Sequence, residues 1–213
     1  TSLIISAFII LLYCILGGFW AASITDTLQA FIMMAAALIV SLVTVNEAGG
    51  FNEIVTKLST IDKNYNDWTG GHSGFLLFGF MTGMIGIGSG TFGQPHLLSR
   101  LMAVKGNYEL KLGAVIAVTW SIIIFCAMAA LGLAARTLIK DLQTGEQVFY
   151  LMAEQLLPPV LAGIVIASIL SAVMSTADSL LLAASSAISH DLGLSKYFSF
   201  EELLVSRLVM SII

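Results

Sequence analysis

Two acidic residues stand inside long apolar stretches of the chain, where ionisable side chains are rare. Of the thirteen aspartates and glutamates, all except Asp26 and Asp178 lie in polar stretches or at their edges, as do all nine lysines and arginines. A charged group at the centre of a bilayer costs at least about 2.5–3.5 kcal/mol, so it usually faces the protein interior and pairs with something. Because no lysine, arginine or histidine lies at comparable depth, we expect the two carboxylates to be protonated, to pair with a segment outside this chain, or to attract a mobile cation.

Oxygen-bearing side chains surround both acids. Ser175, Asp178 and Ser179 stand at positions i, i+3 and i+4, so they share one face of a helix. Asp26 lies in the oxygen-rich segment 23–29. Hydroxyl and carboxylate oxygens suit a hard cation, whereas a soft metal prefers cysteine or histidine. The alternative is that each hydroxyl bonds back to a carbonyl of its own helix, or joins neighbouring helices.

The elements that carry these residues are predicted to be membrane-spanning helices. Hydrophobic residues make up 58% of the chain, charged residues 10%, and the mean hydropathy is +0.96. A soluble domain has about 25% charged residues, and a helix needs roughly 20 apolar residues to cross a bilayer. Helices satisfy their own backbone polar groups in hydrocarbon. The sequence therefore predicts an all-α integral membrane protein, with spans at about 2–17, 19–45, 74–98, 112–135, 158–188 and, begun only, 203–213.

The basic residues predict which ends of the spans face the cytoplasm. The short loops at 100–111 and 196–207 hold five of the nine lysines and arginines, and such loops usually lie in the cytoplasm. At 1.5 Å per residue, Asp26 then lies about 12 Å and Asp178 about 15 Å above the cytoplasmic ends of their spans. Acids at similar depth on two helices can share one site.

The third predicted span is rich in glycine and ends in Gln94-Pro95-His96. Its segment 88–93 matches the dinucleotide pattern GxGxxG, but that fingerprint needs a preceding strand and a βαβ unit, so we exclude it. Two interpretations remain open. Gly79 and Gly83 form a GxxxG pair that favours close helix packing, whereas a helix interrupted in mid-membrane would expose backbone groups to substrate and ions.

The same survey excludes several classes of protein. No basic stripe or recognition motif indicates nucleic-acid binding, and no nucleophile–base pair or metal-ligand cluster indicates an enzyme or a cofactor. Cys14 and Cys126 lie in apolar spans, so we predict neither a disulfide nor a metal site. The chain begins and ends inside apolar blocks, and we expect it to be a fragment of a longer protein.

Three segments resemble motifs of the sodium/solute symporter family and, within it, of the bacterial sodium–proline symporters. Segment 17–29 is similar to the family's GGF…S-x-TD-x-x-Q, segment 92–100 to FGQPH…R, and segment 171–187 to AVMST…SSA. The resemblance covers nearly the whole chain. It implies an inverted-repeat helix bundle of the leucine-transporter type, of which this chain would hold core helices four to eight and the start of nine. Core helices one to three would be missing.

The resemblance also implies two sodium sites. The main site would combine core helix one with the carbonyl of Ala172 and the hydroxyls of Ser175 and Thr176. A second site, present in some relatives, would use Asp26, Ser175, Asp178 and Ser179. These last residues include both acids that the charge distribution indicates.

Substrate recognition is expected at core helix six. Sodium–proline symporters carry a tryptophan and a tyrosine there, where this sequence has Ile87 and Thr91. The difference leaves small organic solutes as the substrate class, with proline or another amino acid as the first candidate. Gly90, Thr91 and Gln94 are the residues that we expect on the substrate side.

These observations predict a secondary active transporter in the plasma membrane, the inner membrane of a bacterium. Its partners would be sodium, a small solute, the lipid bilayer and the missing helices of the same chain. Two alternatives remain. The chain could be a transporter-like sensory module fused to a signalling kinase, or a proton-coupled symporter with Asp178 as the carrier.

Overall fold

The structure, a computed structural model, is mainly helical in its described part and contains no strand there. It describes residues 2–67, 69, 71–139, 144–191, 205, 207 and 210. Three helices of this part are long and apolar enough to cross a membrane, or four if an interrupted pair counts as one span. The prediction of an all-α membrane protein is confirmed at this level. Most of the predicted sixth span, 203–213, lies outside the described residues.

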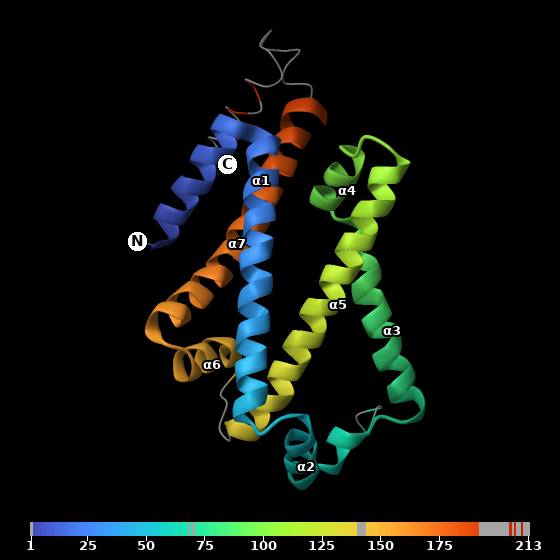
Figure 1. Cartoon of the computed structure of the whole chain (residues 1–213). Coiled ribbons are helices and arrows are strands. Elements are labelled where there is room, and N and C mark those ends of the chain that lie inside the picture. Colours follow the sequence, from blue (N-terminus) through green and yellow to red (C-terminus); the bar gives the residue numbers. More distant parts are fainter. Residues whose placement is uncertain are drawn as a thin grey trace. The chain divides into compact units, whose positions relative to one another are not determined.

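Seven α-helices form the described part of the chain (Figure 1). They are α1 (Ser2–Glu47), α2 (Phe51–Ile61), α3 (Gly74–Gly90), α4 (Pro95–Met102), α5 (Asn107–Leu138), α6 (Val148–Leu156) and α7 (Pro159–Ser186). Short 3₁₀ turns lie at Lys63–Asn66, Thr91–Gly93 and Gly145–Gln147, and a π-helical turn at Ala187–Asp191 follows α7. The chain divides into two compact units. The first contains Thr1–Ile32, Phe92–Val104 and Ile169–Ile213, and the second contains Met33–Thr91 and Lys105–Ser168.

In the first unit, α1 reverses direction at Gly18 (Figure 1). Gly18 has φ 56° and ψ −146°, a conformation that is essentially restricted to glycine. The predicted spans 2–17 and 19–45 meet at this residue. Before the reversal, Ile10 and Cys14 are buried, and Met174 and Leu181 of α7 pack against them. The apolar contact holds the beginning of α1 against the part of α7 that carries Asp178.

Replacing Gly18 with alanine is expected to lower the free energy of unfolding by about 1–3 kcal/mol, because a Cβ is strained at this φ and ψ. The measurement is thermal unfolding of the full-length protein in detergent. Gly163→Ala is the matched control, because Gly163 lies within α7 and an added Cβ there meets nothing within 4 Å. Equal melting temperatures for Gly18→Ala and wild type would contradict the prediction.

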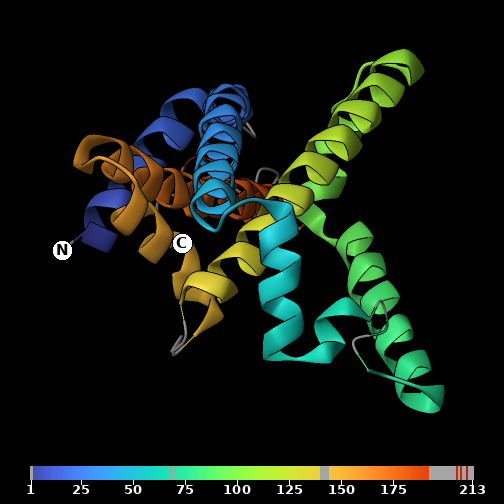
Figure 2. The ribbon, with the colours of Figure 1, turned by 60° about the horizontal axis from the view of Figure 1, so that its bottom comes forward.

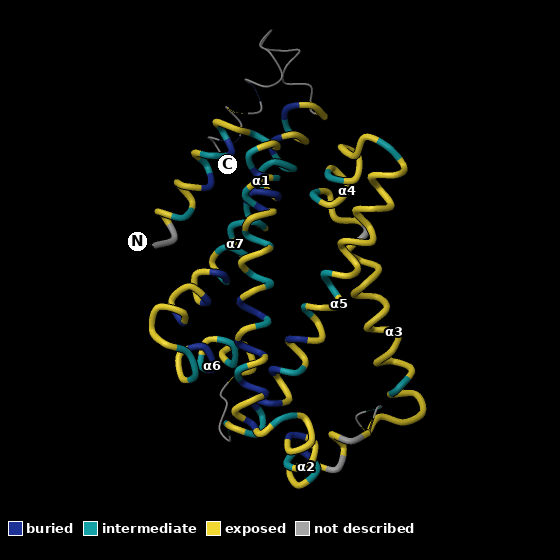
Figure 3. The backbone as a smooth tube through the Cα atoms, viewed as in Figure 1, coloured by how far each residue is buried: buried dark blue, intermediate teal, exposed yellow. Residues whose placement is uncertain are grey.

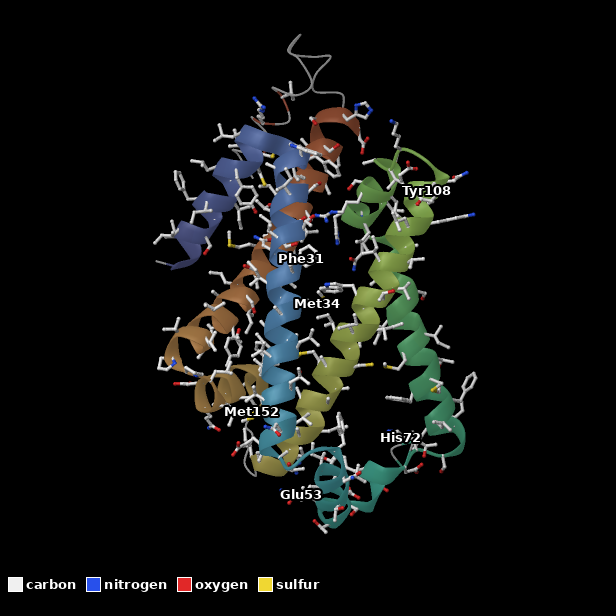
Figure 4. The ribbon with its side chains drawn as sticks, viewed as in Figure 1. Phe31, Met34, Glu53, His72, Tyr108 and Met152 are labelled. Carbon is white, nitrogen blue, oxygen red and sulfur yellow. The ribbon has the colours of Figure 1, made fainter. Side chains whose placement is uncertain are left out.

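The core of the second unit forms where the later part of α1 meets α5, α6 and the start of α7. The buried residues of this cluster are Ala36, Val40, Leu131, Ala135, Met152, Ala153 and Val165. Figure 4 labels Met152 on α6. The helix α2 packs against the end of α5, through Ile54 and Leu58 with Ala134 (Figures 1 and 2). The alanines allow close approach of the helix backbones, and the larger side chains fill the remaining space.

The glycine-rich helix α3 has no buried residue and is exposed along most of its length in Figure 3. A Cβ added at Gly79 or Gly83 would meet nothing within 4 Å, so the GxxxG pair has no packing partner within the described residues. The helix ends at Gly90, and α4 begins at Pro95 after a 3₁₀ turn. Proline suits this first helical position because it has no backbone N–H to satisfy. The structure therefore contains an interruption between Gly90 and Pro95, while close packing at the GxxxG pair stays a prediction.

The loop before α3 is organised by Asp67. The hydroxyl of Thr69 donates to Asp67 Oδ2 at 2.7 Å, the amide of Thr69 donates to Oδ1 at 3.1 Å, and the amide of Gly71 donates to Oδ2 at 3.3 Å. These bonds, the Thr69 hydroxyl first, hold the pKa of Asp67 below its ordinary value. Close by, the ring of His72 stacks on Phe80 with centroids 5.5 Å apart, near the start of α3, where Figure 4 labels His72.

This loop is expected to loosen in acid. Because the pKa of Asp67 is lower in the folded state, its carboxylate stabilises the loop at pH values above the unfolded-state pKa of about 3.9. This stabilisation is lost as the pH falls through the lower pKa of the folded state. Hydrogen exchange at Thr69 and Gly71, corrected for the intrinsic effect of pH, should therefore accelerate between about pH 5 and pH 2. Asp67→Asn should remove this acceleration. The same acceleration in the variant would show that another group controls the loop.

Candidate functional site

The two intramembrane acids lie in the first unit. Asp26, in α1 after the reversal, is 8% exposed, and Asp178, in α7, is fully buried. Both side chains are therefore directed into protein, although the described chain lacks the helices that the sequence resemblance predicts around them. The hydroxyl of Ser179, next to Asp178, is also buried. We call Asp26, Asp178 and Ser179, together with Arg100 and Tyr13 that contact them, the acidic cluster.

Arg100 pairs with Asp26, so the expectation that the acids have no basic counterpart was wrong. Nη2 of Arg100 donates to Oδ2 of Asp26 and to the hydroxyl of Ser179. The sequence indicated that Arg100 belongs to a cytoplasmic loop, but it lies in the last turn of α4, whose backbone brings it to the cluster. The long side chain of arginine carries its charge away from its own backbone position, which a count of residues along a span does not capture.

The acidic cluster continues from Ser179 to Asp178 and Tyr13. The hydroxyl of Ser179 donates to the carbonyl of Ser175 at 2.7 Å and lies 3.3 Å from Oδ1 of Asp178. The hydroxyl of Tyr13 donates to Oδ2 of Asp178 at 2.7 Å. Sequence reasoning missed Tyr13, whose only signal was a phenolic hydroxyl in the first apolar span. The cluster thus connects α1, α4 and α7 through one guanidinium, two carboxylates and two hydroxyls.

Two buried oxygens beside this network have no hydrogen-bond partner among the described residues. They are Oδ1 of Asp26 and Oε1 of Gln29, one helical turn further along α1. A buried polar atom left without a partner costs about 1–3 kcal/mol, so native proteins rarely keep one without a reason. Both atoms are acceptors, and an acceptor is satisfied by a donor or by a cation. Arg100 therefore uses only part of the binding capacity of Asp26.

The residues expected at the main sodium site bond within their own helix. The hydroxyl of Thr176, which is exposed, donates to the carbonyl of Ala172 at 3.1 Å. Ser175 is half-buried, and its carbonyl accepts from Ser179. The hydroxyl of Thr176 thus shows the hydroxyl-to-carbonyl bonding that the alternative interpretation predicts. The main sodium site stays a prediction.

The structure does not bring the expected substrate residues together in a pocket. Gly90 ends α3, Thr91 begins the 3₁₀ turn, and Gln94 precedes α4; all three are exposed. The hydroxyl of Thr91 donates to the carbonyl of Gly88. The carbonyl of Gln94 accepts from the amides of the first turn of α4, at 3.1 Å. They lie at the interruption between α3 and α4, where backbone groups leave the regular helical pattern.

A cavity of about 490 Å³ opens within the first unit beside the acidic cluster. Its lining residues are Gly17, Gly18, Phe19, Trp20, Ser99, Ala103, Leu182, Ala183, Ser185, Ser186, Arg207 and Met210. A much smaller cavity, of about 10 Å³, is lined by Arg100 and Ser179 and shares Phe19, Ser99 and Leu182 with the large one. The ion pair therefore adjoins open space on the side of the Gly18 reversal.

These features define a multi-pass helical membrane protein with a buried cluster of charged and hydroxyl groups between α1, α4 and α7. Oxygen ligands of this type favour a hard monovalent or divalent cation over a soft metal. Intramembrane acids beside an interrupted helix are typical of secondary transporters.

The chain belongs to the sodium:solute symporter family, whose model matches residues 1–210. It is 33% identical to the sodium/proline symporter of Escherichia coli over 225 residues, which cover 100% of this chain and 44% of the relative. It is 35% identical over 195 residues to the sodium/pantothenate symporter of Haemophilus influenzae, covering 91% of this chain and 40% of the relative. A sodium/proline symporter of Staphylococcus aureus is 32% identical over 197 residues, which cover 89% of this chain and 37% of the relative.

The family assignment confirms the resemblance found in the sequence motifs. The family is one of transporters, which agrees with the prediction that the chain is not part of an enzyme. The chain spans less than half the length of these relatives. No solved structure matches the chain significantly. The inverted-repeat arrangement and the numbering of core helices therefore stay predictions.

Proposed function

We propose that the protein containing this chain couples the entry of sodium to the symport of a small organic solute across the inner membrane of a bacterium. The observation that carries the proposal is the acidic cluster, which places Asp26, Asp178 and Ser179 in one buried network within a member of this family. Placing charge at this depth is costly, so a network of this kind is kept where it serves an ion or a proton.

Two sodium sites are proposed, with the residues that the sequence motifs indicate. The main site would use Ala172, Ser175 and Thr176 of α7, completed by core helix one of the full-length protein. The second would use Asp26, Ser175, Asp178 and Ser179. The unpartnered Oδ1 of Asp26 supports this second site, because it leaves an acceptor for a cation. Sodium at either site would join α7 to other helices and so favour one of the two transport conformations.

The proposed solute is a small molecule of the size of an amino acid. The two kinds of relative named above are symporters of proline and of pantothenate, and both of these solutes carry a carboxylate. Gly90, Thr91 and Gln94 are the proposed contacts. Their position at a helix interruption supports this, because backbone groups that leave the regular helical pattern there can face a solute.

The test is uptake of radiolabelled proline and pantothenate into proteoliposomes that contain the full-length protein. An inward sodium gradient should drive accumulation of one of them, while potassium or choline at the same concentration should not. Uptake of both solutes at equal rates with all three cations would contradict sodium coupling.

Proton coupling is the second candidate, and one observation favours it. Asp178 is fully buried and makes no ion pair within the part of the chain that the structure describes, so it could hold a proton. Accumulation that follows an imposed pH gradient, and is unchanged when sodium is removed, would select this candidate. Asp178→Asn should then abolish the response to pH.

A further inference from the structure

The guanidinium of Arg100 occupies the position where two ligands of the second proposed sodium site meet. One nitrogen, Nη2, contacts both Oδ2 of Asp26 and the hydroxyl of Ser179. Arginine remains protonated in proteins, so this group always brings a positive charge. A metal ion coordinated by the same two oxygens would have to stand where Nη2 stands. Occupation of these oxygens by Arg100 and by sodium is therefore mutually exclusive.

The fit of Arg100 to the cluster is incomplete. Oδ1 of Asp26 is buried and receives no hydrogen bond among the described residues, and the same is true of Oε1 of Gln29. A guanidinium donates only along the fixed directions of its N–H bonds. A small ion has no such restriction and can draw several oxygens toward itself. The cluster thus retains acceptor capacity that Arg100 does not use.

The side chain of Arg100 also has space into which it can move away from Asp26 and Ser179. Its side chain is 38% exposed, whereas that of Asp26 is 8% exposed. Arg100 lines the small cavity that shares Phe19, Ser99 and Leu182 with the 490 Å³ cavity. A partly exposed guanidinium at the edge of this cavity can move outward without crossing a packed core.

We propose that Arg100 is a tethered cation that competes with sodium for Asp26 and Ser179, an inference that rests on the proposed function of these residues in sodium binding. Sodium entering the cluster displaces the guanidinium toward the cavity. The return of Arg100 releases sodium and keeps Asp26 neutralised in the sodium-free protein. Each cation thereby weakens the binding of the other, as linkage requires.

The first test is equilibrium binding of radioactive sodium to the purified full-length protein. If Arg100 leaves the site free about a tenth of the time, the apparent dissociation constant is about tenfold above the intrinsic value. Arg100→Gln should therefore bind sodium about tenfold more tightly, and Arg100→Lys should lie between this variant and wild type. Lys105→Gln removes a basic charge from the exposed segment after α4 and should have little effect.

The double variant Asp26→Asn/Arg100→Gln sharpens this test. Without the carboxylate, Arg100 has lost its main partner in the cluster and competes weakly. Arg100→Gln should therefore change sodium affinity much less in the Asp26→Asn background than in wild type. Equal changes in both backgrounds would mean that Arg100 acts through its general charge, and would overturn the proposal.

A second measurement uses the wild-type protein, so it does not depend on a variant that folds. Phenylglyoxal modifies accessible guanidinium groups, and mass spectrometry locates the modified arginine. Sodium should accelerate modification of Arg100, while choline should not, and Arg136 in the same sample serves as the internal reference. An Arg100 reactivity that is indifferent to sodium would overturn the proposal.

The outcomes separate this inference from the function on which it rests. No saturable sodium binding by wild type would overturn both. Saturable binding by wild type, with Arg100→Gln binding equally or more weakly, would leave the sodium proposal intact and reduce Arg100 to a structural ion pair.

Discussion

Replacing Asp26 with asparagine is expected to raise the sodium concentration for half-maximal uptake by about 100-fold. Two unit charges about 4 Å apart interact by about 4 kcal/mol at an effective dielectric constant of 20, which corresponds to a factor of about 1000 in affinity. The same substitution removes the contact through which Arg100 competes with sodium, so about tenfold of the lost sodium affinity should be regained. The measurement is initial uptake rate against sodium concentration in proteoliposomes.

The matched control for this variant is Glu53→Gln. Glu53 also pairs with a basic residue, since its Oε1 lies 3.4 Å from Nζ of Lys57, but both side chains are exposed. Exposed pairs of this kind contribute only about 0–1 kcal/mol. Sodium dependence should therefore match wild type in the control. An Asp26→Asn protein with unchanged sodium dependence would remove Asp26 from the proposed site.

The double substitution of Ser175 and Thr176 by alanine is expected to weaken sodium activation of uptake by about 100-fold as well. A hydroxyl bound to a charged group contributes about 1.5–3 kcal/mol, so each lost ligand should cost at least about tenfold. Solute binding at saturating sodium should change much less. The measurement is again uptake against sodium concentration, with solute affinity determined separately.

Ser168→Ala is the control for the hydroxyl substitutions. Ser168 is a buried residue in the first half of α7, and its hydroxyl donates to the carbonyl of Val165 at 2.6 Å. It thus makes the same kind of backbone bond as Thr176, at a position outside the proposed site. If the double variant behaves like Ser168→Ala, the two hydroxyls serve only the helix, as the alternative interpretation holds.

The interrupted third span shows what the local sequence can predict and what it cannot. Glycines weaken a helix and Pro95 begins a new one, so the sequence allowed an interruption near this point. It could not choose between an interruption and a packed GxxxG face, because that choice depends on which helix lies opposite Gly79 and Gly83. The described residues provide no such partner, and the interruption itself is present.

The acidic cluster likewise contains residues that the sequence predicts and contacts that it does not predict. The sequence alone identified Asp26 and Asp178, since hydropathy and charge can be read position by position and an acid in an apolar span stands out. The partners of these acids could not be read in this way. Arg100 is 74 residues from Asp26, and Tyr13 is 165 residues from Asp178.

What the sequence determined by itself was the helical membrane class, the family, and the two acids with their neighbouring hydroxyls. These properties follow from composition and from spacing within one helix, which the chain carries wherever its helices go. Only the tertiary structure decided that Arg100 neutralises Asp26 and that Tyr13 binds Asp178. Such contacts depend on how α1, α4 and α7 pack in space and on where long side chains end, and neither property is encoded in the order of residues along one helix.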